Sequence, residues 1–116
     1  MTNRLESKSK NLAEEVHKYL VGHYNQKITI DWLCDYFYVS RSTLMNTFKS
    51  QYDMTIHQFL LDYRLEKSIE MLKNNNKTIQ DIAIECGFND ANYFSKAFKK
   101  RYLMSPTSLK EKNTIN

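Results

Sequence analysis

The sequence predicts an all-α fold of about seven helices, in which two helix-turn-helix units are joined by a long connecting helix. Three observations predict it. Only two glycines and one proline occur in 116 residues, and a fold with many strands would need more of them for its turns. Apolar residues recur at helical spacing along most of the chain. A long stretch of the sequence is also repeated, and such a repeat determines the architecture.

Length and composition indicate one globular domain, because domains commonly contain about 100–200 residues. Hydrophobic residues make up 41% of the chain and charged residues 26%, a balance that argues against intrinsic disorder. We expect a flexible N-terminal segment at residues 1–9, a folded domain at residues 10–112 and a tail at residues 113–116.

A first helix is predicted over residues 11–24. Glu14 and Glu15 lie in its first turn, where acidic residues are typical. The residues that form its apolar stripe are Leu12, Val16, Tyr19, Leu20 and His23.

Residues 29–59 are similar to residues 78–109. The offset is 49 at first and 50 from Ser40 onward, so the second copy has one additional residue near Gly87–Asn89. The matched residues are Thr29, Ile30, Leu33 and Cys34 with Thr78, Ile79, Ile82 and Ala83, and Ser40, Leu44, Phe48, Lys49, Tyr52, Met54 and Thr55 with Asp90, Phe94, Phe98, Lys99, Tyr102, Met104 and Ser105. Each copy predicts a helix, a tight turn and a second helix, at about residues 29–52 and 78–102.

The helices of both copies begin at capping residues. Thr29 begins the first helix of copy one, and Thr78 forms a capping box with Asp81 in copy two. Ser40 and Asp90 are favourable N-caps of the second helices. Apolar residues four positions apart in those second helices are predicted to face the core: Leu44 with Phe48, and Phe94 with Phe98.

The connecting helix is predicted at about residues 56–74, where Thr55 and Gln58 form a capping box. Its apolar side consists of Ile56, Phe59, Leu60, Tyr63, Ile69 and Leu72. Ser105, followed by Pro106 at the first helical position, opens a short last helix.

Basic residues are concentrated near the C-terminus. The whole chain has a formal net charge of +4, yet residues 91–112 alone contain six basic side chains against one acidic side chain. The basic residues are Lys96, Lys99, Lys100, Arg101, Lys110 and Lys112, and the acidic one is Glu111. This distribution suits a molecule that presents one face to a polyanion.

The second helix of each copy has a polar stripe opposite its apolar one. At spacings i, i+3, i+4 and i+7, the stripes are Ser42, Met45, Asn46 and Lys49 in the first copy, and Asn92, Ser95, Lys96 and Lys99 in the second. In a helix-turn-helix the second helix enters the major groove of DNA. Asn pairs with adenine, Lys donates to guanine, and Met contacts the methyl group of thymine. Ordinary solvated helix faces are also polar, but two matching stripes at a fixed repeat favour base readout.

The connecting helix has a length compatible with two adjacent grooves. Roughly 18 residues at about 1.5 Å each span about 27 Å, whereas successive major grooves on one face of DNA are about 34 Å apart. Our hypothesis is that both second helices enter adjacent major grooves, and that bending of the DNA makes up the difference.

The stretch from Ile79 to Pro106, IQDIAIECGFNDANYFSKAFKKRYLMSP, resembles the second helix-turn-helix signature of AraC/XylS-type transcription regulators. Val39, Ser40, Arg41, Ser42, Leu44, Phe48 and Lys49 are similar to the first unit of that family, and the resemblance covers about residues 10–112. It implies one polypeptide that binds double-stranded DNA through two reading helices and activates transcription through contacts with RNA polymerase.

The resemblance assigns base contacts to Ser42, Met45, Asn46, Asn92, Ser95 and Lys96. For the DNA backbone we predict contacts from Arg41, Thr43, Lys49, Tyr93, Lys99 and Lys100. The chain departs from the family at Asp53 and Leu103, where glycine is usual, and at Leu109 and Lys110, where Tyr and Arg are usual. Lys96 stands where Arg is frequent and lacks the planar fork that pairs best with guanine.

Most members of this family have an effector or receiver domain ahead of the DNA-binding domain. The chain is therefore either an excised C-terminal domain or a short stand-alone regulator, and we favour excision. We expect this domain to be a monomer, with any dimerisation belonging to a longer, intact protein.

No apolar run approaches a membrane span, and no signal sequence is evident, so we expect a cytoplasmic protein.

Two other classes of function fit the sequence less well. We expect no enzyme and no cofactor, because His17, His23 and His57 lack a matched nucleophile or carboxylate pair. Cys34 and Cys86 fit buried free thiols better than a metal site. The alternative is a helical protein-interaction module that binds an acidic partner through its basic, aromatic surface. Phosphate-driven binding would weaken steeply with salt, which distinguishes the two.

Overall fold

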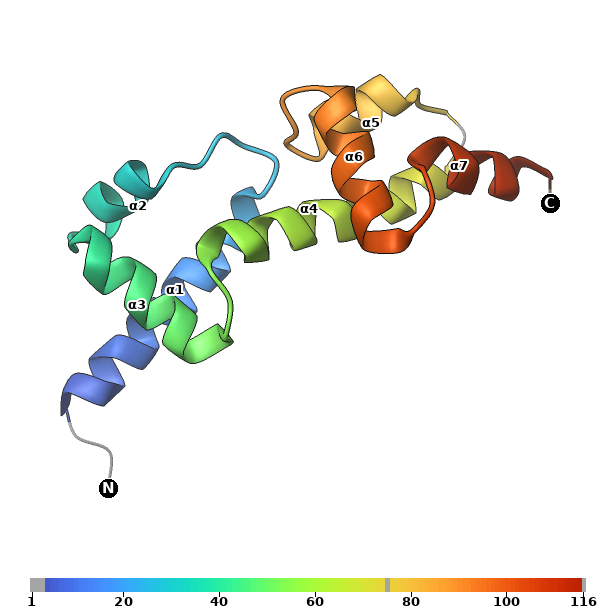
Figure 1. The fold of residues 1–116 in the computed structure, drawn as a ribbon. Helices are drawn as coiled ribbons and strands as arrows, with labels where there is room; N and C mark the ends of the chain where they lie inside the picture. Colours follow the sequence, from blue (N-terminus) through green and yellow to red (C-terminus); the bar gives the residue numbers. More distant parts are fainter. Residues whose placement is uncertain (1–3, 75, 116) are drawn as a thin grey trace. The chain divides into compact units, whose positions relative to one another are not determined.

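The computed structural model describes residues 4–74 and 76–115, and this part of the chain contains seven helices and no strand (Figure 1). The helices are α1 (Arg4–His23), α2 (Ile30–Phe37), α3 (Arg41–Tyr52), α4 (Ile56–Lys73), α5 (Ile79–Glu85), α6 (Ala91–Tyr102) and α7 (Pro106–Ile115). The predicted all-α class is confirmed. Among the described residues, no helix is both long enough and apolar enough to cross a membrane.

The two ends of the chain contain more helix than the sequence predicted. The first helix was expected to begin at residue 11, but α1 begins at Arg4, so it includes most of the segment that was expected to be flexible. At the other end α7 reaches Ile115, within the expected tail at residues 113–116. Both helices were predicted from apolar residues at helical spacing, and each helix extends beyond the residues that show this pattern.

The chain divides into two compact units, one up to Leu61 and one from Asp62, and the division falls within α4. In the first unit α1 packs against α3, and α2 packs against α3. The core of this unit consists of Val16, Leu20, Ile30, Leu33, Leu44, Phe48, Ile56 and Leu60. Most of the residues that helical spacing predicted for the core of this unit are therefore buried in it.

In the second unit α5 and α7 both pack against α6. Its buried apolar residues are Leu65, Leu72, Ile82, Ala83, Cys86, Phe88, Phe94, Phe98 and Pro106. Ser68 is also buried, and its hydroxyl donates to the carbonyl of Leu65 at 2.5 Å, so its polar atom is satisfied. The side chain of Lys110 donates to the carbonyl of Lys77 and thereby ties α7 to the segment before α5.

The predicted helix caps are present. Thr29 accepts a hydrogen bond from the backbone N of Trp32 at 3.0 Å, and Thr78 and Asp81 form the predicted capping box. Thr55 Oγ1 accepts from the backbone N of Gln58 at 3.0 Å. These side chains satisfy backbone N–H groups that have no partner inside the helix, which explains why α2, α4 and α5 begin where the sequence predicted.

Three helices end at a non-glycine residue in the left-handed conformation: Tyr38 with φ 55°, Asp53 with φ 58° and Leu103 with φ 62°. The N–H of each bonds to the carbonyl four residues back, which closes the last turn. Glycine is favoured at such positions because it has no Cβ to clash. Two of these residues, Asp53 and Leu103, are those at which the sequence departs from the family's usual glycine.

Both cysteines are free thiols, but only Cys86 is buried as the sequence predicted. Cys34 is half-buried, whereas Cys86 is fully buried and lies 3.6 Å from the sulfur of Met71. Burial, which disfavours the thiolate, raises the pKa of Cys86 to about 11. A thiol of this kind behaves as a small apolar side chain and is a poor nucleophile at neutral pH.

Candidate nucleic-acid interface

The first polar stripe lies on the surface of α3. Ser40 caps this helix, and its Oγ accepts a hydrogen bond from the backbone N of Thr43 at 3.2 Å. Leu44 and Phe48 are completely buried, so this face of the helix is fixed against the core. The four residues of the predicted stripe are all exposed: Ser42, Met45, Asn46 and Lys49.

The second polar stripe lies on α6 in an equivalent arrangement. Asp90 caps the helix by accepting a hydrogen bond from the backbone N of Tyr93 at 2.7 Å. Phe94 and Phe98 are completely buried. The exposed residues of the stripe are Asn92, Lys96 and Lys99. The duplication seen in the sequence is therefore also a duplication of exposed polar helix faces.

Ser95 is a partial exception, because it was predicted to be exposed and is instead half-buried. It is four residues after the half-buried Ala91 and three residues before the buried Phe98, so it lies toward the covered side of α6. A short side chain in that position reaches less far from the helix than Lys96 does.

Arg41, predicted to contact the DNA backbone, is paired with an acidic residue in this structure. Its Nη2 donates to Asp31 Oδ1 at 2.6 Å, which links the start of α3 to the first turn of α2. Both side chains are largely exposed, and an ion pair of this kind is worth at most about 1 kcal/mol. A phosphate could therefore compete with Asp31 for the guanidinium group.

The basic residues at the end of α6 differ in whether they form an ion pair. Lys99 and Lys100 are exposed, and neither forms an ion pair with another described residue. Arg101, by contrast, lies 3.4 Å from Asp62. Tyr93 is 52% exposed and meets Phe88 edge to face. The positions predicted for backbone contacts on α6 are thus on the surface, and the two lysines are available to an anion.

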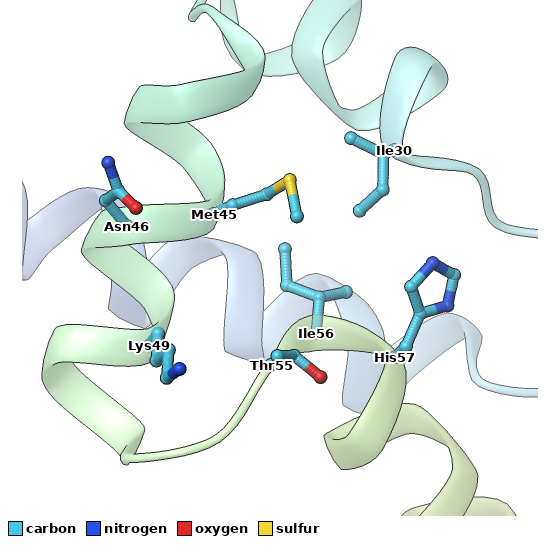
Figure 2. A pocket seen from close by; sticks show the side chains of 7 residues that line it. All are labelled: Ile30, Met45, Asn46, Lys49, Thr55, Ile56 and His57. Atoms are coloured by element: carbon cyan, nitrogen blue, oxygen red, sulfur yellow. The ribbon is translucent and has the colours of Figure 1, made fainter.

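A depression next to the first stripe includes a residue that the sequence analysis did not assign to the interface. It has a volume of about 240 Å³. Its lining residues are Ile30, Met45, Asn46, Lys49, Thr55, Ile56 and His57 (Figure 2). His57 lies in the first turn of α4, beyond the reading helix in sequence, so helical spacing on α3 could not have identified it. Its position two residues after the predicted capping residue Thr55 was the only signal in the sequence that places it at the start of α4.

The other two histidines contact aromatic side chains or the backbone of their own unit. His17 stacks on Tyr52, with ring centroids 4.7 Å apart, and also contacts Phe59. His23 Nδ1 lies 2.9 Å from the carbonyl oxygen of Tyr19, within hydrogen-bonding distance. In the part of the chain that the structure describes, no group of three or more His, Cys, Asp or Glu side chains is arranged to hold a metal ion.

Comparison with protein families gives a direct match. A family described as "Helix-turn-helix domain" matches residues 33–112, which is most of the chain. RhaR of Mannheimia succiniciproducens, described as an "HTH-type transcriptional activator", is 34% identical over 80% of this chain and 35% of its own length. RhaS of Escherichia coli, described in the same way, is 31% identical over 80% of this chain and 34% of its own length. The chain therefore spans about a third of these relatives.

Solved structures share the fold. The C-terminal domain of the response regulator AraT from Geobacillus stearothermophilus has a TM-score of 0.82 at 26% identity, covering 87% of this chain and 84% of that one. The DNA-binding domain of AdpA, solved with a target DNA, has a TM-score of 0.80 at 21% identity, covering 85% and 89%. Together with the duplicated helix pairs and their exposed stripes, these matches show that the chain belongs to the AraC/XylS-type family of helix-turn-helix domains, the DNA-binding domains of transcription regulators.

Proposed function

We propose that this chain recognises a specific double-stranded DNA sequence by inserting α3 and α6 into adjacent major grooves, as the DNA-binding part of a transcription regulator. One observation carries the proposal. Each of two equivalent helices is fixed by a buried apolar face and exposes a polar face of the kind that reads bases. The relatives RhaR and RhaS are named as transcriptional activators, which supports a role in transcription.

The exposed side chains provide complementary base contacts. On α3, Asn46 can pair with adenine through its amide, and Met45, which is 41% exposed, can contact a thymine methyl group. On α6, Asn92 offers a second amide, and Lys96 can donate to guanine. Ser42 and Ser95 complete the proposed set of base contacts, although the half-buried Ser95 has the shorter reach.

The proposed backbone contacts surround these stripes. They come from Arg41, Thr43 and Lys49 on α3 and from Tyr93, Lys99 and Lys100 on α6. Such contacts fix the register of the protein on the duplex and carry no sequence information themselves. The proposal requires no cofactor and no catalytic step. It places the domain as a monomer on DNA in the cytoplasm, with RNA polymerase as a further partner of the complete regulator.

The length of α4 is compatible with two adjacent grooves. Its 18 residues span about 27 Å at ~1.5 Å per residue. This is somewhat less than the ~34 Å between successive major grooves. We therefore expect the duplex to bend toward the protein, which makes easily deformed base steps between the half-sites part of the recognition.

Selection of bound duplexes from a random pool tests the proposal. We expect an enriched site with two half-sites about 10 base pairs apart, and a footprint that covers two major grooves. Enrichment of a single half-site, or a footprint over one groove, would contradict the use of both helices. Affinity for the selected duplex should also fall steeply with salt, by ~0.9 log units per log unit of salt for each phosphate neutralised. Weak salt dependence would favour the alternative of an acidic protein partner.

A further inference from the structure

The depression beside α3 is a feature of the surface that base readout alone does not explain. It is formed by residues from three elements: the start of α2, the exposed face of α3 and the first turn of α4. In Figure 2 the thioether of Met45 extends between Ile30 and Ile56, whereas the amide of Asn46 points away from them. In this view Lys49 and His57 lie on either side of Thr55 and Ile56. The depression therefore directly adjoins the side chains proposed to read bases.

The lining residues combine an apolar floor with a rim of hydrogen-bond donors. Ile30 and Ile56 are buried, and they form the floor together with Met45. Lys49 and His57 are exposed at the rim. No Asp or Glu is among the lining residues, so the site is unsuited to a cation and suited to an anion. Its volume of about 240 Å³ is far larger than the ~10–15 Å³ that one water molecule needs on the same measure, so the depression is large enough for a group bigger than a single ion.

A deoxyribose-phosphate unit has the matching chemistry. The carbon-bound hydrogens of the sugar can rest on apolar side chains, and the phosphate oxygens accept hydrogen bonds from Lys and from an imidazole N–H. We propose that the depression holds one backbone nucleotide of the bound duplex, with the sugar against Ile30 and Met45 and the phosphate between Lys49 and His57. This inference rests on the proposed DNA-binding function and adds His57 as a contact residue.

The second copy of the repeat keeps the lysine and has smaller side chains at the other two equivalent positions. At the offset of 50 residues, Lys49, Thr55 and His57 correspond to Lys99, Ser105 and Thr107. Ser105 Oγ accepts a hydrogen bond from the backbone N of Ser108 at 3.0 Å, as Thr55 Oγ1 does from Gln58. A lysine followed by a capped helix start thus recurs in both units. The hydroxyl of Thr107 replaces the longer imidazole, so we expect the Thr107→Ala variant to lose less affinity than His57→Ala.

The test compares the parent chain with His57→Ala and His57→Gln, with His23→Gln as the control, because His23 lies outside the depression. His57 is exposed, so both of its variants should fold, and circular dichroism and thermal unfolding can verify the fold of every variant, including His23→Gln. His57→Ala should weaken binding to the selected duplex and to random duplexes alike, by about 10-fold, the effect of losing one hydrogen bond to a charged group. The ratio of the two affinities should stay constant, because a backbone contact carries no sequence information.

The contacted phosphate can be located from the DNA side. A series of duplexes, each with one neutral methylphosphonate in the first half-site, should contain one position that weakens the parent more than it weakens His57→Ala, because the variant has only the Lys49 contact left to lose there. Wild-type affinity of His57→Ala, or equal losses for parent and variant at every position, would overturn the inference. So would a loss confined to the selected duplex, because His57 would then read a base. If the parent bound no duplex at all, the proposed function itself would fail.

Discussion

The left-handed conformation of Leu103 predicts that replacing this residue by glycine stabilises the protein. A residue with a Cβ pays about 1–2 kcal/mol in this conformation. Leu103 has φ 62°, and its N–H bonds to the carbonyl oxygen of Lys99 at 2.8 Å, so the turn at the end of α6 holds it there. Glycine relieves the clash and keeps that hydrogen bond.

Two opposing effects reduce the gain. Glycine has more conformational freedom in the unfolded chain, which costs about 0.5–1 kcal/mol on folding. The leucine side chain is 87% exposed, and since full burial is worth about 1.5–3 kcal/mol, its removal loses only about 0.2–0.4 kcal/mol. We therefore expect Leu103→Gly to raise the free energy of unfolding by about 0.5 kcal/mol, or the melting temperature by about 2–4 °C.

Leu103→Ala is the matched control, because it removes most of the side chain and keeps the Cβ. It should be less stable than Leu103→Gly by about 0.5–1 kcal/mol in urea-induced unfolding. Asp53→Gly should gain less than Leu103→Gly, because Asp tolerates the left-handed conformation better than Leu does. If Leu103→Ala proved as stable as Leu103→Gly, backbone strain at this helix end would not be the reason that glycine is favoured there.

Three further predictions concern binding and the core. Asn46→Ala and Lys96→Ala should each cost about 1–3 kcal/mol on the selected duplex and relax its sequence at one or two base pairs, and equal losses on random DNA in competition assays would refute base contact. Lys99→Ala and Lys100→Ala should weaken binding to all sequences and reduce the salt slope by ~0.9 each, which a salt titration measures. Phe94→Ala should destabilise the fold by about 3–5 kcal/mol in chemical denaturation because it opens a core cavity, and an unchanged midpoint would show that this face of α6 is not buried as described.

The sequence predicts helix starts and buried faces well because both are determined locally. A capping hydroxyl such as that of Ser40 acts on backbone N–H groups two or three residues away. Residues four positions apart, such as Phe94 and Phe98, must share one face of any helix. These rules located both stripes before the packing was known, and the structure buries the residues opposite to them.

Features that depend on packing between helices could not be predicted in this way. The half-burial of Ser95 depends on how far the covered side of α6 extends around the helix, which spacing alone does not define. The depression at His57 exists because the start of α4 lies beside α3 and the start of α2. The ion pair between Arg41 and Asp31 likewise joins two helices across a turn. In each case the feature depends on a contact between two helices. The spacing of residues within one helix does not define such a contact.

The two stripes differ in chemistry, and under the proposed function this difference predicts a fixed orientation of the domain on DNA. Met45 and Asn46 on α3 correspond to Ser95 and Lys96 on α6, so an apolar and amide pair is matched by a hydroxyl and a cation. A homodimer presents the same helix twice and prefers a palindrome, but a single chain with two unlike readers favours two different half-sites in a fixed order. Such a site has a polarity, so inverting it in a promoter would turn the bound protein to face the opposite direction along the chromosome.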